Sequence, residues 1–164
     1  MRNFILFLFI SCLLPACTSR YYLVRHAEKQ DDSPNALLSP TGLARANILR
    51  DSLIGKGIEQ VYASTVQRTQ QTAQPLASAL GLPLTIYKPD TVGGFVAALK
   101  KLRGKAVLVV GHSNNIPEIV QGLSGESAGI ADNDYDNLFI VKITRAWGQT
   151  RIKLTKTTYG PVSP

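Results

Sequence analysis

Residues 106–115 read AVLVVGHSNN, and this stretch decides the fold. Its first five residues are all apolar, which is typical of a central β-strand that is covered on both faces in a parallel sheet. Gly111 and His112 follow that strand directly. Because ligands bind at the carboxyl ends of the strands in such sheets, we expect the His112 imidazole at the edge of a binding site.

A second apolar strand leads to the only other histidine of the chain. Residues 21–29 read YYLVRHAEK, so Arg25 and His26 stand where this strand runs out into a turn. Between the two histidines, residues 61–73 read VYASTVQRTQQTA, a strand, a turn and a helix with Arg68 in its first turn. Two histidines and two arginines at three strand ends predict a pocket for a phosphoryl group.

The remaining sequence alternates predicted strands with predicted helices. Ser39 followed by Pro40 is typical of a helix start, and Asn115 is predicted to cap the last helix. The last two strands flank residues 147–149 and form an antiparallel hairpin at one sheet edge. This order predicts a three-layer α/β/α sandwich whose sheet is mostly parallel with an antiparallel edge. Strands are expected at residues 21–25, 60–63, 83–87, 106–110, 137–144 and 150–155, and helices at residues 40–54, 66–80, 92–102 and 116–123.

Four of these segments resemble the histidine phosphatase superfamily, the phosphoglycerate-mutase-like proteins. The resemblance runs from about Tyr21 to beyond His112 and implies a phosphoglycerate-mutase-like fold. The family usually has a glycine after its first histidine, where this chain has Ala27. The matching motifs are Arg25-His26-Ala27, LSPTG at residues 38–42, the segment from Ser64 through Arg68 to Ala73, and Gly111-His112.

The resemblance implies a role for each matching residue. His26 is the nucleophile that takes the phosphoryl group, and Arg25, Arg68 and His112 form the rest of the phosphate cradle. Larger relatives supply a leaving-group acid from a glutamate after the third strand, and this chain has no glutamate there. Asp90 is therefore the predicted acid. Its rivals come from the first loop and are Glu28, Asp31 and Asp32.

These residue types suit a dianionic phosphate monoester. Arginine offers a planar fork that stays charged, and Arg68 near a helix start adds free backbone amides and the helix dipole. An imidazole with an ordinary pKa of about 6.5 is largely neutral at pH 7, as a nucleophile must be. The two histidines are not paired as metal ligands and no usable cysteine pair accompanies them, so we expect no metal and no cofactor.

Two other patterns have simpler interpretations. Ser64 lacks the Gly-x-Ser-x-Gly context of a serine nucleophile and is interpreted as a turn or N-cap residue. Asp132, Asp134 and Asp136 alternate like the start of a calcium loop. The glycine and the distal glutamate of such a loop are absent, so a solvated loop is expected there.

The amino terminus predicts a lipoprotein. A basic start is followed by an apolar run at residues 4–14, which is too short to span a bilayer and has the proportions of a signal peptide. Residues 14–17 read LPAC and resemble a bacterial lipobox, which implies cleavage before Cys17 and lipidation of its thiol, for example by palmitate. An ordinary signal peptide that is cut a few residues later is the alternative. Residues 17–164 then form a single domain, with residues 18–20 as a short tether.

The charge of the chain fits a phosphorylated partner. Without the leader, 17 basic and 11 acidic residues give a net charge of +6, one less than the +7 of the whole chain. The basic residues are dispersed, so nucleic-acid binding is not expected. A phosphorylated small molecule or phosphoprotein, or anionic lipid beside the anchor, explains the charge better. Thr18 rather than aspartate follows Cys17, which predicts a bacterial cell-envelope location at the outer membrane, facing the periplasm.

Together these features predict a metal-independent phosphomonoester hydrolase that acts through a phosphohistidine on His26. A phosphoglycerate-type mutase is one alternative, although the short segment between Asp90 and His112 has no room for the long insertions that shield a mutase site. A non-catalytic lipoprotein that binds a phosphorylated ligand is the other alternative, and the presence of His26 argues against it.

Overall fold

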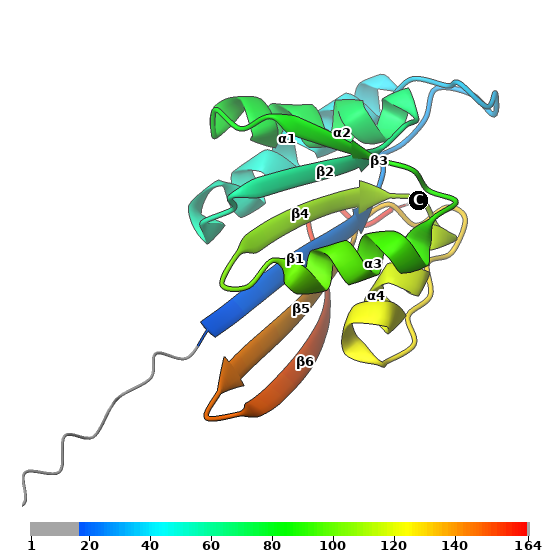
Figure 1. The fold of residues 1–164 in the computed structure, drawn as a ribbon. Coiled ribbons are helices and arrows are strands. Elements are labelled where there is room, and N and C mark those ends of the chain that lie inside the picture. The colour runs from blue at the N-terminus through cyan, green and yellow to red at the C-terminus, as the bar shows by residue number, and fades with distance from the viewer. Residues whose placement is uncertain (1–16, 164) are drawn as a thin grey trace, which may run out of the picture.

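The computed structural model describes residues 17–163, which form one six-stranded sheet in the order β3-β2-β4-β1-β5-β6 (Figure 1). β3, β2, β4 and β1 are parallel to one another, whereas β5 runs antiparallel to β1 and β6 antiparallel to β5. The predicted parallel sheet with an antiparallel edge is confirmed. The strands are β1 (Cys17–Arg25), β2 (Gln60–Ser64), β3 (Leu84–Tyr87), β4 (Ala106–Gly111), β5 (Asn137–Ala146) and β6 (Gln149–Thr158).

Helices cover both faces of this sheet, so the predicted three-layer sandwich is also confirmed. α1 and α2 pack against one face, and α3 and α4 pack against the other (Figure 1). The helices are α1 (Pro40–Leu53), followed by a short 3₁₀ turn, η1 (Ile54–Lys56), α2 (Gln67–Ala79), α3 (Val92–Lys101) and α4 (Asn115–Ser124).

The apolar strands β1 and β4 lie at the centre and contribute to both hydrophobic clusters. Tyr22 and Val24 of β1 join the cluster under α1 and α2, whereas Tyr21 and Leu23 join the cluster under α3 and α4. Successive side chains of a strand point to opposite faces, which is why an uninterrupted apolar run is needed here. Both clusters consist of residues between 17 and 163, so this part of the chain contains its own core.

The helix starts agree with the sequence in one case and differ in another. The Ser39 hydroxyl accepts a hydrogen bond from the Gly42 amide at 3.1 Å, so the predicted cap of α1 is confirmed. In α4 the N-cap is Asn114 rather than Asn115. Asn115 is the first helical residue, and its side-chain oxygen accepts from the His112 amide at 2.8 Å. The side chain of Asn115 thus stabilises the turn after β4 and does not cap the helix.

The first strand is longer than the sequence suggested. β1 begins at Cys17, and residues 17–20 pair with β5, with Cys17 opposite Arg145. The prediction of a tether at residues 18–20 is therefore wrong, because the long antiparallel partner extends the sheet to Cys17. The predicted signal peptide, residues 1–16, lies outside the described residues and stays a prediction. Within residues 17–163 no helix is both long and apolar enough to cross a membrane.

A two-residue turn joins β5 to β6. Its residues Trp147 and Gly148 have φ values of 57° and 73°. Positive φ at both central positions defines a type I′ turn, whose twist matches the hairpin strands. Trp147 is the one non-glycine residue with positive φ in the described part of the chain.

Candidate active site

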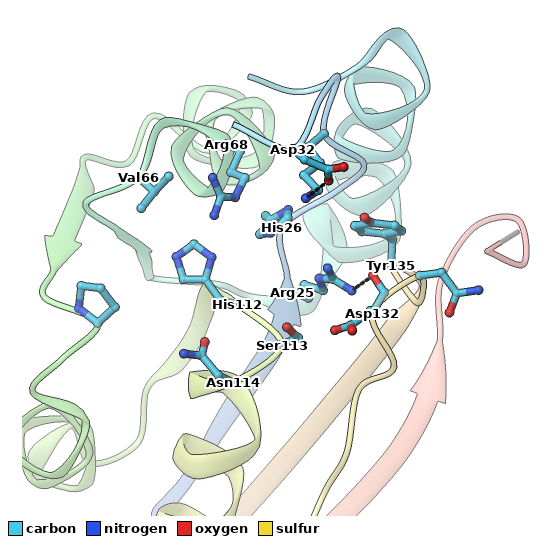
Figure 2. A pocket seen from close by; sticks show the side chains of 13 residues that line it. Arg25, His26, Asp32, Val66, Arg68, His112, Ser113, Asn114, Asp132 and Tyr135 are labelled. Atoms are coloured by element: carbon cyan, nitrogen blue, oxygen red, sulfur yellow. Dashed lines mark hydrogen bonds and ion pairs between the residues drawn. The ribbon is translucent and has the colours of Figure 1, made fainter. Parts of the chain in front are cut away.

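One cavity of about 790 Å³ opens at the carboxyl ends of the parallel strands. We call it the strand-end pocket. Arg25, His26, Arg68 and His112, which come from three separate segments, all line it (Figure 2). The structure thus brings together the four residues that the sequence predicted to share a site.

His26 is held in a state suited to nucleophilic attack. Its side chain is 3% exposed, and its Nδ1 lies 2.8 Å from the carbonyl oxygen of Ala27. A carbonyl oxygen can only accept, so Nδ1 carries the proton and Nε2 keeps its lone pair. Burial lowers the pKa of His26 to about 3, and the charges of Arg68 and Arg25 act in the same direction while the Ala27 hydrogen bond opposes them. The imidazole is therefore neutral well below pH 7.

His112 lies beside His26, with the two rings 5.4 Å apart in an edge-on arrangement. Its Nε2 is 2.8 Å from the Ser64 hydroxyl, which in turn lies 2.9 Å from the Thr69 hydroxyl. Ser64 had been interpreted as a turn or N-cap residue. The N-cap of α2 is Val66 instead, and Ser64 orients His112. Burial, followed by the charges of Arg68 and Arg25, lowers the pKa of His112 to about 4.

Gly111 allows the turn that presents His112. A Cβ atom at this position would lie 2.5 Å from the Asn115 side-chain oxygen and 2.6 Å from the Tyr87 hydroxyl. Both neighbours are buried, so neither can move away easily. The glycine before the second histidine is therefore required by close packing at the end of β4.

Arg25 connects the strand-end pocket to a loop from the far end of the chain. It is 6% exposed, and its Nη1 donates to the carbonyl oxygens of Ala131, Asp132 and Asp134 at 2.9, 2.7 and 3.2 Å. Its guanidinium also lies 4.3 Å from the centre of the Tyr135 ring, a cation–π contact. The loop with Asp132, Asp134 and Asp136 is exposed at residues 131–133, as expected of a solvated loop, but Asp136 is buried. Asp132, Asn133 and Tyr135 of this loop form one wall of the pocket.

Arg68 lies in the first turn of α2, as predicted, and its Nη1 donates to the Pro34 carbonyl at 2.8 Å. Burial, and then the nearby charge of Arg25, lower the pKa of Arg68. Within residues 17–163 neither arginine has a carboxylate partner in a salt bridge, and the Nε atoms of both are buried without a hydrogen-bond partner. Buried donors of this kind call for an acceptor, and an oxyanion between the two guanidinium groups supplies one.

Asp90, the residue predicted to be the leaving-group acid, does not line the strand-end pocket, and neither does its rival Glu28. Asp90 is exposed in the turn after β3, and only its neighbour Pro89 lines the pocket. Glu28 is buried against Arg45, whose Nε and Nη2 lie 2.8 and 2.7 Å from one of its oxygens. Glu28 therefore holds the first loop to α1, and it does not line the pocket.

The other two candidates lie in the first loop. Asp31 is exposed and accepts a hydrogen bond from the Ser33 amide at 2.8 Å. Asp32 lines the strand-end pocket beside Lys29, with which it forms an ion pair, and its side chain is 95% exposed. Of the four carboxylates considered from the sequence, Asp32 is the one that the pocket includes (Figure 2).

Several pocket residues had no signal in the sequence. The turn after β4 and the loop at residues 131–135 contribute most of them, and neither segment has a periodic pattern from which its position could be predicted. Among residues 17–163 no group of three or more His, Cys, Asp or Glu side chains is placed to hold a metal ion. The lining residues not predicted are Lys29, Val66, Pro89, Ser113, Asn114, Asp132, Asn133 and Tyr135.

The α/β sandwich places a cationic, histidine-containing pocket at its strand ends, and such a pocket suits an oxyanion. The family model described as histidine phosphatase superfamily (branch 1) matches residues 21–88, which include Arg25, His26 and Arg68. The match spans 68 of the 164 residues, and over this segment the chain is similar to that superfamily, in agreement with the sequence motifs.

Solved structures extend the likeness in fold over more than four fifths of the chain. The protein histidine phosphatase SixA complexed with tungstate has a TM-score of 0.67 at 20% identity, covering 85% of this chain and 96% of that one. A mycobacterial glucosyl-3-phosphoglycerate phosphatase has a TM-score of 0.66 at 13% identity, covering 84% and 97%. At these identities the likeness concerns the fold.

A curated relative is more similar in sequence over a shorter region. It is named "probable phosphoglycerate mutase GpmB", from Yersinia pestis, and is 36% identical over an alignment that covers 38% of this chain and 33% of the relative. The chain thus matches about a third of the length of the curated relatives. The names of these proteins include both phosphatases and a mutase.

Proposed function

We propose that the protein is a metal-independent phosphomonoester hydrolase that works through a phosphohistidine on His26. One observation carries the proposal: two arginines without carboxylate partners, each with a buried and unpaired Nε, share a pocket with a histidine whose Nε2 is unprotonated. The arginines supply the positive charge that a metal ion supplies in other phosphoryl-transfer sites.

The reaction takes place in two displacements. In the first, the Nε2 lone pair of His26 attacks phosphorus, an N–P bond forms, and the P–O bond to the leaving group breaks. The leaving oxygen keeps the bonding electrons and takes up a proton. In the second, water attacks phosphorus and loses a proton to solvent, the N–P bond breaks, and inorganic phosphate leaves. Arg25, Arg68 and His112 stabilise the charge on the equatorial oxygens in both steps.

The carboxylates around the pocket favour substrates with a good leaving group. Glu28 is engaged with Arg45 and Asp90 lies outside the lining, so the exposed Asp32 is the one of these carboxylates left to protonate a leaving group. Aryl phosphates need little protonation of the leaving oxygen. A phosphorylated imidazole leaves through nitrogen, which suits the same pocket, and SixA is named a protein histidine phosphatase. The partner is therefore a phosphorylated small molecule or a phosphoprotein.

The covalent intermediate provides the direct test. The protein is mixed rapidly with a radiolabelled aryl phosphate and quenched in alkali, where phosphohistidine survives and phosphoserine is lost. Label on the peptide that contains His26 supports the proposal, and label elsewhere or none during turnover contradicts it. Adding a monophosphoglycerate as acceptor separates a hydrolase from a phosphoglycerate-type mutase, because the mutase passes the label to this acceptor whereas the hydrolase releases it as inorganic phosphate.

The leaving-group acid can be tested with two matched substitutions. Asp32→Asn is expected to slow an alkyl phosphate by about 10²-fold and an aryl phosphate much less, because only the alkoxide needs a proton to leave. Asp90→Asn makes the same chemical change at another exposed carboxylate and should leave both rates unchanged. Steady-state rates on the two substrates decide, and a selective loss in Asp90→Asn instead would return the role to Asp90.

Proton NMR can test the state of the two histidines, which are the only ones in the chain. Because burial lowers both pKa values, to about 3 and about 4, neither imidazole should titrate between pH 8 and 5 in the folded protein. The unfolded chain binds protons below about pH 6.5, so the free energy of unfolding should fall as the pH falls from there. Inorganic phosphate, an anion beside both rings, should raise both pKa values. Titration near pH 6.5 in the free protein would contradict the buried neutral state.

We further propose that the protein is a lipoprotein of the cell envelope, anchored through Cys17. The support is the LPAC sequence at residues 14–17 after an apolar run. Cys17→Ala is expected to abolish incorporation of labelled palmitate in the producing bacterium and to leave the precursor uncleaved. A mature amino terminus beyond Cys17 in the unmodified protein would show an ordinary secreted protein instead.

A further inference from the structure

The end of the sheet opposite the strand-end pocket carries a second distinctive surface. Cys17, Arg103 and Arg145 line a shallow depression there together with residues 146–150. A neighbouring depression shares Trp147 and adds Arg151. We call these residues the hairpin-end surface. Figure 1 shows the turn between β5 and β6 at the same end of the sheet as the start of β1.

Trp147 is exposed on this surface and has a backbone conformation that is unfavourable for a bulky residue. It is 68% exposed and has a φ of 57°, in the left-handed region that bulky side chains avoid. The sequence best suited to this type I′ turn is Asn-Gly, and here it is Trp-Gly. An exposed indole in a strained turn adds nothing to the core. Indoles do prefer membrane–water interfaces, where the ring is apolar and its N–H stays hydrated.

The charge around Trp147 has one sign. The lining of the two depressions includes three arginines and no carboxylate. Arg145 also has a buried Nη1 without a partner, and α3 ends nearby with Lys100 and Lys101. The strand-end pocket differs in this respect, because its lining mixes Arg25, Lys29 and Arg68 with Asp32 and Asp132.

We propose that the hairpin-end surface docks onto an anionic lipid bilayer. Cys17 lies in this surface, and the apolar run of residues 4–14 precedes it in the sequence. A basic patch beside a lipid anchor adds electrostatic attraction to anionic headgroups and so strengthens membrane binding. An exposed indole flanked by arginines at the chain's own attachment point fits that role. This inference rests in part on the proposed anchor at Cys17 and does not depend on the phosphatase proposal.

Residues 17–163, which contain the complete core, allow the surface to be tested without an acyl chain. The probe is vesicles of phosphatidylglycerol and phosphatidylcholine, with phosphatidylcholine alone as the reference. Trp147 is the only tryptophan, so its emission should shift to the blue on the anionic vesicles and be quenched by brominated lipid. No shift and no sedimentation with the anionic vesicles, or binding to single-stranded RNA in their place, would overturn the proposal.

Charge variants separate this surface from the general basic character of the protein. Arg103→Gln with Arg151→Gln should weaken vesicle binding by roughly 25-fold, about fivefold for each charge near the membrane. Lys88→Gln with Lys156→Gln removes the same charge after β3 and near the end of β6, towards the other end of the sheet, and should have less than a twofold effect. Equal losses in the two double variants would show non-specific attraction and refute the assignment.

Trp147→Asn gives a result that a purely structural tryptophan cannot give. Asparagine tolerates the left-handed conformation, so the variant should melt about 2–4 °C higher than the unchanged protein. Sedimentation with anionic vesicles should nevertheless fall by at least tenfold, while hydrolysis in solution stays the same. A variant that is more stable and binds vesicles as well as before would contradict the role of Trp147.

Discussion

Replacing His26 by alanine is expected to reduce phosphate release from an aryl phosphate to the uncatalysed rate, a loss of roughly 10⁴-fold or more. The reason is that the neutral Nε2, fixed by the hydrogen bond from Nδ1 to Ala27, is the only group in the site assigned to attack phosphorus. The measurement is initial-rate kinetics together with alkaline trapping, in which the variant should carry no label.

The control for this experiment is ligand binding. The variant keeps Arg25, Arg68 and His112, so it should still bind inorganic phosphate or tungstate and unfold cooperatively. Ser64→Ala removes only the hydroxyl beside His112 and should keep measurable turnover. Undiminished hydrolysis by His26→Ala would reject the mechanism. Phosphate binding without turnover in the unchanged protein would identify a non-catalytic binding protein.

Arg25→Leu is expected to lower kcat/KM by about 10²–10³-fold, the usual effect of removing one group that stabilises transition-state charge. A second loss accompanies it, because the carbonyl oxygens of Ala131, Asp132 and Asp134 lose their shared donor. Amide hydrogen exchange of residues 131–135 should therefore become faster. Kinetics and exchange together measure the two effects separately.

Arg68→Leu is the matched control for the second effect. Its guanidinium donates to one carbonyl, that of Pro34, so exchange at residues 131–135 should stay unchanged while kcat/KM falls. Arg25→Lys should not restore activity, because one ammonium group cannot reproduce a planar fork that faces both the loop and the ligand. Full activity in Arg25→Lys would show that only the charge matters.

The fold could be predicted from the sequence because its central strands carry strong local signals. Residues 106–110 are all apolar, so both faces of this strand must be buried, and this requires a central position in a sheet that is covered on both sides. The start of β1 was harder to predict, because residues 17–20 are polar and their place in the sheet depends on pairing with β5. Pairing between distant segments leaves no pattern in a short stretch of sequence.

The site likewise has residues that the sequence predicts and residues that it does not. His26, His112, Arg25 and Arg68 follow strands or start a helix, so the direction of the parallel sheet predicts that they meet. The wall at residues 131–135 is held by backbone carbonyl oxygens, which every residue possesses and which no sequence motif marks.

The acid illustrates a further difficulty. Glu28 and Asp32 stand close together in one loop, yet Glu28 is buried against Arg45 and Asp32 faces the pocket. Their sequence positions alone do not distinguish these environments.

β1 runs without interruption from Cys17 to Arg25, and this sets a length scale for the whole molecule. At about 3.3 Å per residue, its two ends are roughly 26 Å apart. If the start of β1 is held at a surface, the Nε2 atom of His26 lies at the opposite end of this strand, away from that surface. Headgroups of the supporting leaflet cannot reach it, and substrates must arrive from the aqueous side. With that anchor, the protein would diffuse laterally in its membrane and act on substrates in the adjacent solution, and the lipids of the same leaflet would not be its substrates.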